Sequence, residues 1–378
     1  MKIGLDYISV FSGGGNATYA RELIRGLSRI DQKNNYYLYT YLHKFLPFYR
    51  NEIVHKDNFD YKVGYFCWPY KILKKNIHVF EEQLLFQRSK KDKIDLFHIT
   101  NPLRFNRYLK NFIITIHDLC YLKESSFIKK SSIDFYQKNF KDILNNCQSI
   151  ISVSQSTKKD ILDNFDFPAD KIFVIYEGIS KIFKPKPNKD YIKEKFNLNK
   201  EYILSVGEIQ PRKNLFRLLQ SYSQLSSSLR ENYELVIAGQ SRGGDIMNKL
   251  IAEVKKLKIE NQVKFLGYVE INDLPYLYSS ARVFAYPSLY EGFGLPVLES
   301  LACGTPVITS TNSSLPEVLG LGGILVDPYK VEEIKFALEN ILTKNDLRDN
   351  LSKEGIKHSN SFSWEKAAQQ TLKIYEKY

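Results

Sequence analysis

The chain has 378 residues, which is enough for two domains that each bury a hydrophobic core. Hydrophobic residues make up 43% of it and charged residues 25%, and both values are ordinary for a globular protein. The formal net charge of +12 predicts an anionic partner, and a nucleotide, an anionic membrane surface and nucleic acid all qualify. Nucleic acid is the weakest of these, because the chain has no recognised nucleic-acid-binding motif.

Cysteine usage and the first residues bear on the cellular compartment. The four cysteines lie far apart with no CxxC pair, which predicts reduced thiols and excludes a disulfide framework or a zinc site. Met1–Asp6 carries an acid where a signal peptide would be apolar, and no apolar run approaches the length of a membrane span. We therefore expect a cytoplasmic protein that is neither exported nor integral to a membrane.

Short β-rich runs alternate with helical patterns along the whole chain, which predicts a parallel α/β architecture. The first half begins with a strand at residues 1–5, a loop at 13–16 and an amphipathic helix at 18–27. Its further strands are expected at residues 36–41, 96–99, 112–116, 149–153 and 172–176. A second series is expected at residues 202–206, 235–238, 263–266, 283–286, 307–309 and 323–326. Two strand series predict two doubly wound domains.

A segment rich in prolines and charges, Ile182–Asn188, reads as a linker between the domains. We therefore expect an N-terminal domain over residues 1–182 and a C-terminal domain over 189–360. A last helix is expected over residues 363–378.

The first candidate motif is a glycine run that follows the first strand and opens the first helix. Gly14 and Gly15 would let a phosphate or an acceptor group approach the backbone closely. The dinucleotide pattern G-x-G-x-x-G is not met, and a glycine run is about as often a flexible turn.

His117 comes just past the carboxyl end of an apolar strand, at the sheet edge where open α/β sheets bind ligands. A lone histidine there is more often a capped strand end than a catalyst. His98 also ends a strand, and we interpret it as structural.

Two cations, Arg212 and Lys213, follow the first strand of the second series and precede its first helix. Fixed cations at this position can neutralise a leaving diphosphate without a metal. Basic residues are disfavoured at a helix start, so a merely solvated helix end explains them less well.

The most informative stretch is Tyr286–Thr309, which places Glu291 and Glu299 around a glycine-rich turn at a helix start. Gly292 and Gly294 permit an unusual backbone, and Pro296 suits the first helical turn. Bare amides at the positive end of a helix bind a diphosphate, and each carboxylate can accept hydrogen bonds from neighbouring sugar hydroxyls. The pattern predicts a sugar-nucleotide site in which both carboxylates face a solvated cleft.

The run from Glu291 to Glu299 resembles the E-x7-E motif of the family 4 retaining glycosyltransferases. This resemblance implies the α/β GT-B fold, with two doubly wound Rossmann-like domains facing a central cleft and the last helix packed back on the N-terminal domain. Asn101 and the segment Val79–Leu84 are similar to bacterial members related to mannosyltransferases.

The resemblance also implies roles for residues of this chain. His117 and Glu291 would orient the donor sugar, Arg212 and Lys213 would hold the departing diphosphate, and Glu299 would hold the ribose. The remaining donor-binding residues would be Gly14, Gly15, Val269, Gly292, Phe293, Gly294, Leu295 and Pro296. No Asp-x-Asp motif is present, so neither a metal nor another cofactor is expected.

The implied reaction moves a hexose from a nucleotide diphosphate sugar, GDP-mannose or a UDP-sugar, to a hydroxyl of a glycan or lipid-linked acceptor. Synthesis of a cell-surface polysaccharide is the implied setting. A sugar-nucleotide epimerase or phosphorylase on the same scaffold is an alternative, as is a non-catalytic carbohydrate-binding scaffold. Sugar transfer that depends on an added acceptor would distinguish the transferase from the epimerase or phosphorylase.

The run from Lys44 to Lys75 interleaves aromatic and basic residues. Such a mixture suits an anionic membrane interface on the inner face of the plasma membrane, and it equally suits a partly buried core with a solvated rim.

Overall fold

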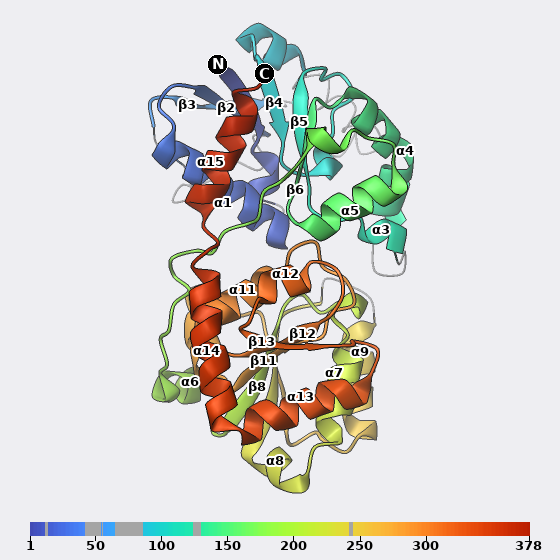
Figure 1. Cartoon of the computed structure of the whole chain (residues 1–378), viewed down its shortest axis with the longest axis vertical. Coiled ribbons are helices and arrows are strands. Elements are labelled where there is room, and N and C mark those ends of the chain that lie inside the picture. Colours follow the sequence, from blue (N-terminus) through green and yellow to red (C-terminus); the bar gives the residue numbers. More distant parts are fainter. Residues whose placement is uncertain (12–13, 42–53, 55, 65–85, 124–129, 242–244) are drawn as a thin grey trace, which may run out of the picture. The chain divides into compact units, whose positions relative to one another are not determined.

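The computed structural model describes residues 1–11, 14–41, 54, 56–64, 86–123, 130–241 and 245–378. They form two compact units (Figure 1), of which the first comprises Met1–Gly178 and Trp364–Tyr378 and the second Ile179–Ser363. The predicted linker at Ile182–Asn188 therefore lies inside the second unit. Most of the run from Lys44 to Lys75, like the segment Val79–Leu84, lies outside the described residues.

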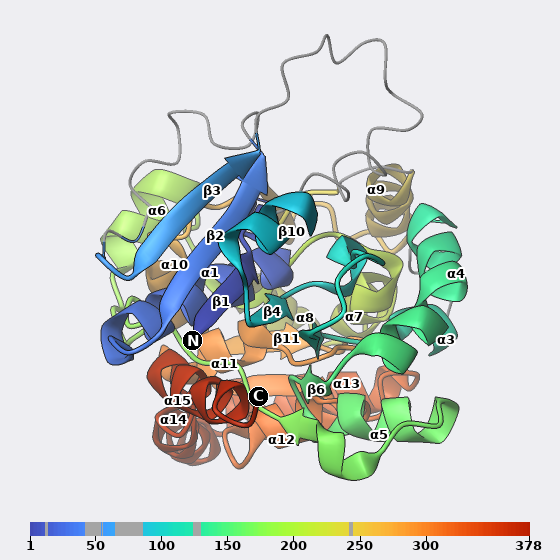
Figure 2. The ribbon, with the colours of Figure 1, turned by 90° about the horizontal axis from the view of Figure 1, so that it is seen from above.

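The first unit contains a seven-stranded parallel sheet with the strand order β3-β2-β1-β4-β5-β6-β7 (Figure 2). Its strands are β1 (Lys2–Asp6), β2 (Asn35–Tyr41), β3 (Phe59–Gly64), β4 (Leu96–Ile99), β5 (Phe112–Ile116), β6 (Ser149–Ser152) and β7 (Ile172–Val174). The central strands β4, β5 and β6 are buried along their whole length, as expected for parallel strands with helices on both faces. The prediction missed β3.

Helices cover this sheet, and the last helix of the chain is one of them. They are α1 (Gly14–Ile30), α3 (Cys120–Lys123), α4 (Lys130–Asn146), α5 (Gln155–Asn164) and α15 (Trp364–Tyr375). Helices α1 and α15 lie side by side, as Figure 1 shows. They meet so closely at Gly26 that a Cβ atom there would lie 2.9 Å from the Cβ atom of Ala368.

One expectation about this unit is wrong. The glycine run was expected to be a loop, but α1 already begins at Gly14, so Gly14 and Gly15 lie in the first turn of the helix. Gly14 has a φ of +74°, which glycine adopts without strain and which explains why a glycine opens this helix.

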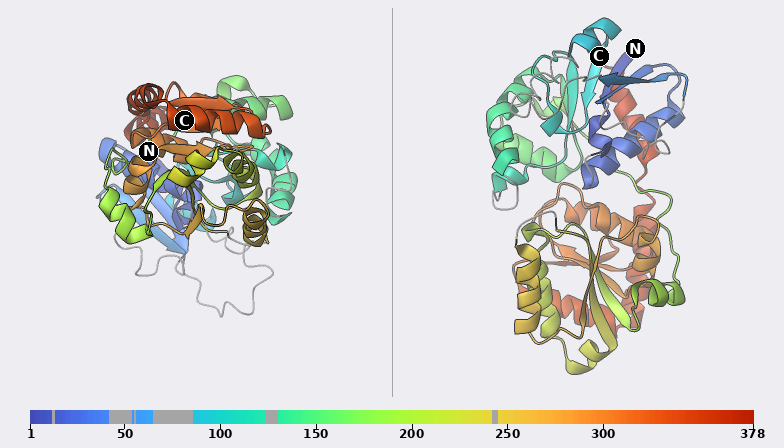
Figure 3. Two further views of the ribbon diagram at one scale, coloured as in Figure 1. Left: turned by 90° about the horizontal axis from the view of Figure 1, so that it is seen from below. Right: turned by 180° about the vertical axis from the view of Figure 1, so that it is seen from behind.

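The second unit (Figure 3) contains a six-stranded parallel sheet. Its strand order is β10-β9-β8-β11-β12-β13. Its strands are β8 (Glu201–Val206), β9 (Tyr233–Ala238), β10 (Val263–Gly267), β11 (Val283–Tyr286), β12 (Val307–Ser310) and β13 (Gly323–Val326). The order reverses between β8 and β11, and open α/β sheets bind ligands at the carboxyl ends of the strands beside such a reversal.

Nine helices of the second unit fall in its described residues, together with the 3-10 turn η7 (Pro211–Lys213). The helices are α6 (Lys189–Phe196), α7 (Leu215–Ser223), α8 (Ser227–Asn232), α9 (Ile246–Lys256), α10 (Leu274–Ser280), α11 (Leu295–Ala302), α12 (Leu315–Leu319), α13 (Val331–Thr343) and α14 (Asn345–Ser359). A core of this unit packs helices α7 and α13 against the strands through buried residues such as Leu218, Ile237 and Leu338. In the described parts of both units, no helix is long and apolar enough to cross a bilayer.

Candidate active site

The reversal of strand order in the second unit brings two loops together. Strands β8 and β11 are paired neighbours, so the loops that follow them leave the same edge of the sheet. Arg212 and Lys213 lie in η7, between β8 and α7, and Glu291 lies between β11 and α11. The fold thus brings Glu291 to two residues that lie almost eighty positions earlier in the sequence.

Glu291 is the centre of this group. Its Oε2 atom lies 2.5 Å from Nη1 of Arg212, and its Oε1 atom lies 2.6 Å from Nζ of Lys213. The residue is 8% exposed. Burial would raise the pKa of this carboxyl, but the charges of the two cations prevail and hold the pKa at about 2. Glu291 is therefore ionised at neutral pH.

Two hydroxyl groups complete what we call the Glu291 cluster, which consists of Arg212, Lys213, Tyr286, Ser288 and Glu291. Tyr286 donates its hydroxyl to Oε1 of Glu291 at 2.9 Å, and Ser288 donates to the same atom at 2.6 Å. The Lys213 ammonium donates to the Tyr286 hydroxyl and lies 4.7 Å from the centre of the Tyr286 ring. Burial, together with the neighbouring Arg212 charge, lowers the pKa of Lys213 to about 8.

The cluster corrects the expectation that Glu291 faces a solvated cleft. Among the described residues, three donors reach its Oε1 atom, whereas one reaches Oε2. A carboxylate oxygen has two lone pairs, so Oε2 is the atom with room for a ligand hydroxyl. Removing this side chain would also leave two buried or partly buried cations without their partner, which costs stability.

The turn between Glu291 and α11 is fixed by its backbone. Gly294 has a φ of +113°, and a Cβ atom there would lie 3.0 Å from Cδ2 of Leu315. Ser314 donates its hydroxyl to the carbonyls of Glu291 and Phe293, at 2.9 and 2.7 Å. The predicted residues Gly292 and Phe293 are buried in this turn, and Leu295 and Pro296 open α11 in half-buried positions.

Glu299 lies on α11, about one turn after its start at Leu295. Tyr278 donates its hydroxyl to Oε2 of Glu299 at 2.9 Å, and no other hydrogen bond to the Glu299 carboxylate occurs among the described residues. Burial raises the pKa of Glu299 to about 7, although the Tyr278 hydrogen bond opposes this shift. The two glutamates of one motif therefore differ: Glu291 is held ionised by cations, whereas Glu299 titrates near neutrality.

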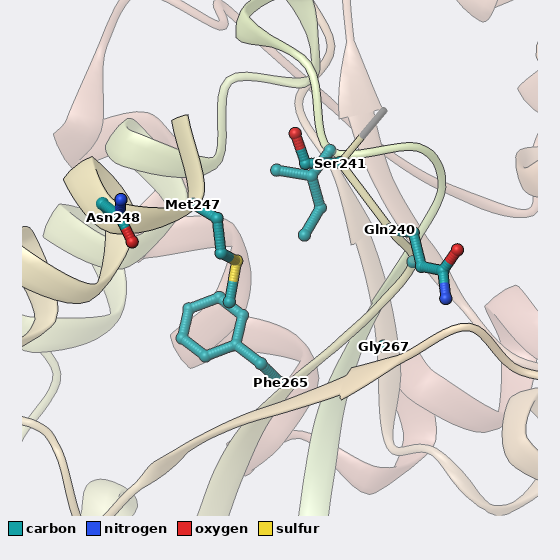
Figure 4. A pocket seen from close by; sticks show the side chains of 8 residues that line it. Gln240, Ser241, Met247, Asn248, Phe265 and Gly267 are labelled. Atoms are coloured by element: carbon teal, nitrogen blue, oxygen red, sulfur yellow. The ribbon is translucent and has the colours of Figure 1, made fainter. Parts of the chain in front are cut away.

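A pocket of about 500 Å³ opens at the carboxyl ends of β8, β9 and β10. Figure 4 shows Met247 and Phe265 beside each other at one side of it and Gln240 at the other. Gly239 lines the pocket and also packs against the carbonyl of Gly207, whose own neighbour is Lys213. This pocket thus adjoins the cation site. Val269, predicted to bind the donor, is buried after β10 but does not line it.

His117 belongs to the first unit, where it follows β5 and is 8% exposed. Its Nε2 atom lies 2.9 Å from the carbonyl oxygen of Thr100, and its Nδ1 atom lies 3.4 Å from Oε1 of Glu177. The Tyr19 ring meets the imidazole edge-on with ring centres 4.8 Å apart. Both ring nitrogens thus have partners within the unit.

His98, interpreted as structural, is fully buried on β4. Its Nδ1 atom lies 2.7 Å from the Tyr375 hydroxyl and its Nε2 atom 2.8 Å from the Thr115 hydroxyl. Burial lowers the pKa of His98 to about 3, so the ring is neutral. The structure agrees with a packing role.

Sequence reasoning missed several side chains that shape the site. Tyr286 and Ser288 belong to the motif that drew attention, yet they were given no role, because a tyrosine in an apolar strand resembles a core residue. Tyr278 gives no local signal, since it lies on α10, 21 positions before Glu299. No group of three metal-ligating side chains occurs in the part of the chain that the structure describes.

Comparisons with known proteins show the family to which the chain belongs. The family described as Glycosyltransferase Family 4 matches residues 13–181, and the family described as Glycosyl transferases group 1 matches residues 188–358. The O-antigen chain mannosyltransferase B of Escherichia coli is 34% identical over 273 residues, which cover 71% of this chain and 71% of that one. The serotype-specific mannosyltransferase WbdA of Escherichia coli is 30% identical over 263 residues, 68% of this chain.

The match covers 32% of WbdA, so the chain spans about a third of that longer protein. The solved structure of sucrose-phosphate synthase from Thermosynechococcus elongatus has the same fold, with a TM-score of 0.79 and 23% identity over 100% of this chain and 98% of that one. The chain therefore belongs to the family 4, or group 1, glycosyltransferases with the GT-B fold, and it is a glycosyltransferase.

Proposed function

We propose that this enzyme transfers mannose, or a closely related hexose, from a nucleotide diphosphate sugar to a hydroxyl of a glycan or lipid-linked acceptor in the synthesis of a cell-surface polysaccharide. The Glu291 cluster is the single observation that carries the proposal. It places a carboxylate, whose Oε2 atom receives one donor among the described residues, beside two cations where the paired strands β8 and β11 end. The relatives named as mannosyltransferases support mannose as the sugar.

The cluster suggests how donor and enzyme interact. Arg212 and Lys213 supply positive charge for the diphosphate, whose negative charge increases as the bond to the sugar breaks. Oε2 of Glu291 accepts a hydroxyl of the transferred sugar, while Tyr286 and Ser288 hold Oε1 in place. Hydrogen bonds that fix the reacting sugar lower the barrier by orientation.

The remaining side chains of the site contact the other parts of the donor, which are its ribose and its base. Glu299 accepts the ribose hydroxyls, and the base lies in the pocket between Met247 and Gln240, whose volume of about 500 Å³ is ordinary for a small-ligand site. His117, carried over from the family motif, contacts the transferred sugar. Gly14, Gly15, Val269 and the turn from Gly292 to Pro296 complete the donor site.

We further propose that transfer retains the anomeric configuration. Glu291 has its carboxylate engaged by four donors from the protein, an arrangement that favours a fixed acceptor of hydrogen bonds over a covalent nucleophile. Departure of the diphosphate and attack of the acceptor on the same face of the sugar need no enzyme nucleophile.

The reaction should run in the cytoplasm, with the enzyme attached peripherally to the inner face of the plasma membrane. The net charge of +12 and the aromatic and basic residues between Lys44 and Lys75 support this setting.

A donor panel tests the transferase proposal directly. We expect GDP-mannose or one UDP-sugar to be hydrolysed slowly, and transferred when acceptor is added. In steady-state kinetics Glu291→Gln should mainly lower kcat, because it weakens contacts to the reacting sugar. Glu299→Gln should mainly raise the donor KM, because the ribose does not change in the reaction. Interconversion of the donor sugar without transfer would instead identify an epimerase.

Chelation tests the role of the cations. Arg212 and Lys213 already supply positive charge, so EDTA should leave turnover unchanged. Complete loss in EDTA, with recovery on adding Mn²⁺ or Mg²⁺, would contradict the proposed stabilisation of the leaving group.

A further inference from the structure

A second pocket, of about 280 Å³, lies in the first unit at the amino ends of β4 and β5. This is the edge of the sheet opposite to the one that His117 follows. Its lining comes from residues 86–97 and from the segment 109–111 before β5. The pocket is therefore separate from every residue assigned to the donor site.

The floor of this pocket is apolar and its rim is cationic. Phe86, Ile94, Phe97 and Leu109 supply the apolar lining, and Lys90, Lys93 and Lys110 the ammonium groups. All three lysines are exposed, and the Lys90 Nζ atom lies 4.7 Å from the centre of the Phe86 ring. Among the described residues, none of the three forms an ion pair within 4 Å.

The acids nearest in sequence are engaged elsewhere. Asp92 accepts the Tyr39 hydroxyl at 2.9 Å and lies 3.9 Å from the Lys62 ammonium. Asp95 accepts the backbone N–H of Lys2 at 2.8 Å. Among the described residues, neither carboxylate forms an ion pair with a lysine of the pocket rim.

A simple alternative is that these lysines only stabilise a helix end. Residues 86–92 are helical, and cations near a helix C-terminus are favourable. This explains Lys90 and Lys93, but Lys110 comes from a different segment. Lys93 has a φ of +54° at the position after the helix, where glycine or asparagine is usual. Termination of the helix therefore does not explain why position 93 is a lysine.

We propose that this pocket binds the phosphate of an anionic amphiphile, with the phosphate between the three ammonium groups and the adjoining hydrocarbon on Phe86 and Leu109. The occupant to which we commit is an anionic phospholipid of a bilayer. The proposal deepens the membrane attachment proposed above and assigns it to described residues outside the run from Lys44 to Lys75. Charge complementarity carries it, because a cationic rim over an apolar floor matches a phosphate beside a hydrocarbon chain.

Sedimentation of the full chain with vesicles tests it. We expect binding to phosphatidylcholine vesicles that contain phosphatidylglycerol and none to pure phosphatidylcholine. The double variant Lys93→Ser/Lys110→Ser should bind the anionic vesicles about 25-fold more weakly, at roughly fivefold per lysine. The matched control is Lys353→Ser/Lys357→Ser on α14, where both lysines are exposed and the loss of net charge is the same.

Three outcomes would overturn the proposal: no binding of the wild type, no effect of the pocket variant, or an equal loss in both variants.

A competition experiment with excess inorganic phosphate at constant ionic strength distinguishes a phospholipid headgroup from free phosphate as the occupant. Vesicles should stay bound, because the apolar floor adds to the attraction, and complete displacement would identify free phosphate as the occupant instead. Donor binding, measured on the same variants, should not change. If the wild type did not bind the donor, the proposed donor site would be contradicted, but the conclusion from vesicle binding would be unaffected.

Discussion

Two groups of the site, Glu299 and Lys213, have pKa values that are shifted to about 7 and about 8. Below pH 7 Glu299 gains a proton and accepts ribose hydroxyls less well, so donor affinity should rise as the pH rises through this value. Above pH 8 Lys213 loses its charge, so the affinity for the diphosphate should fall. We expect the donor affinity to be highest between these two values.

Calorimetric titration with the nucleotide sugar, whose diphosphate is esterified at both ends and stays fully ionised over this range, measures the profile from about pH 5.5 to about pH 9.5. Glu299→Gln should remove the acid limb and leave the alkaline limb in place. The neighbouring Glu291 and Tyr286 do not titrate in this range, because cations hold the pKa of the carboxyl at about 2 and burial raises that of the phenol well above its usual value. An unchanged acid limb in the variant would show that another group causes it.

Tyr286 links the cation and the carboxylate of the cluster, since its hydroxyl accepts from Lys213 and donates to Glu291. Tyr286→Phe keeps the buried ring and removes both hydrogen bonds. We expect kcat/KM for the donor to fall roughly 5- to 30-fold, which corresponds to about 1 to 2 kcal/mol. Steady-state kinetics at varied donor concentration measures the change.

Tyr222→Phe is the matched control for this substitution. Tyr222 is also buried and donates its hydroxyl to a carbonyl, that of Tyr233, but it lies outside the Glu291 cluster. It should change stability slightly and leave the kinetics alone. Equal losses of activity in the two variants would mean that the Tyr286 hydroxyl only supports the fold.

At the residue scale, the charged residues of the site could be predicted from the sequence, but the hydroxyl groups that hydrogen-bond to them could not. Arg212, Lys213 and Glu291 could be grouped because each follows a strand, and the edge of a sheet is shared by all its strands. The hydroxyls of Tyr278 and Tyr286 could not be assigned, because their hydrogen bonds depend on side-chain directions that no local pattern encodes. The burial of Glu291 was missed for the same reason.

At the scale of elements, α1 and α15 approach each other most closely at Gly26. A methyl group there would lie 2.9 Å from both the Ala368 Cβ atom and the Trp364 carbonyl oxygen. Gly26→Ala should therefore destabilise the first unit by about 1 to 3 kcal/mol through overpacking, although alanine favours a helix. Thermal unfolding should show a drop of roughly 2 to 4 °C for each kcal/mol.

Gly15→Ala on the same helix is the comparison for Gly26→Ala. A Cβ atom at Gly15 would meet nothing within 4 Å. This substitution should leave the melting temperature unchanged or raise it slightly. If both variants melt alike, the contact between α1 and α15 is looser than the structure indicates.

The strands themselves were predictable to different degrees. Those at Leu96–Ile99, Phe112–Ile116 and Val283–Tyr286 were predicted with their observed bounds, because short runs of apolar β-formers are typical of buried parallel strands. Strand β3 (Phe59–Gly64) was missed, since Asp60 and Lys62 interrupt its apolar pattern. Charged residues are common on edge strands, where they discourage pairing with another chain, and β3 is an edge strand.

At the scale of the whole molecule, α15 connects the end of the chain to the first unit's polar interior. The Tyr375 hydroxyl contacts His98, His98 contacts Thr115, and Thr115 lies 2.9 Å from the Tyr19 hydroxyl. The Tyr19 ring packs edge-on against His117. A buried row of polar groups thus runs from the last helix to the neighbour of a candidate catalytic histidine.

This connection predicts how the molecule can be divided. Residues 179–363 hold a complete sheet, their own core and the Glu291 cluster, so this fragment should fold alone and bind the nucleoside diphosphate. Residues 1–178 lack α15, which buries Trp364, Ala368 and Tyr375 in the first unit. That fragment should aggregate or unfold without cooperativity, because α1 would expose its packing face and His98 would lose the Tyr375 hydroxyl.

Joining residues 1–178 through a flexible linker to 364–378 should restore a cooperative transition, measured by circular dichroism and urea unfolding. Cooperative unfolding of residues 1–178 alone, at the same urea midpoint as the joined fragment, would show that α15 is dispensable for this unit.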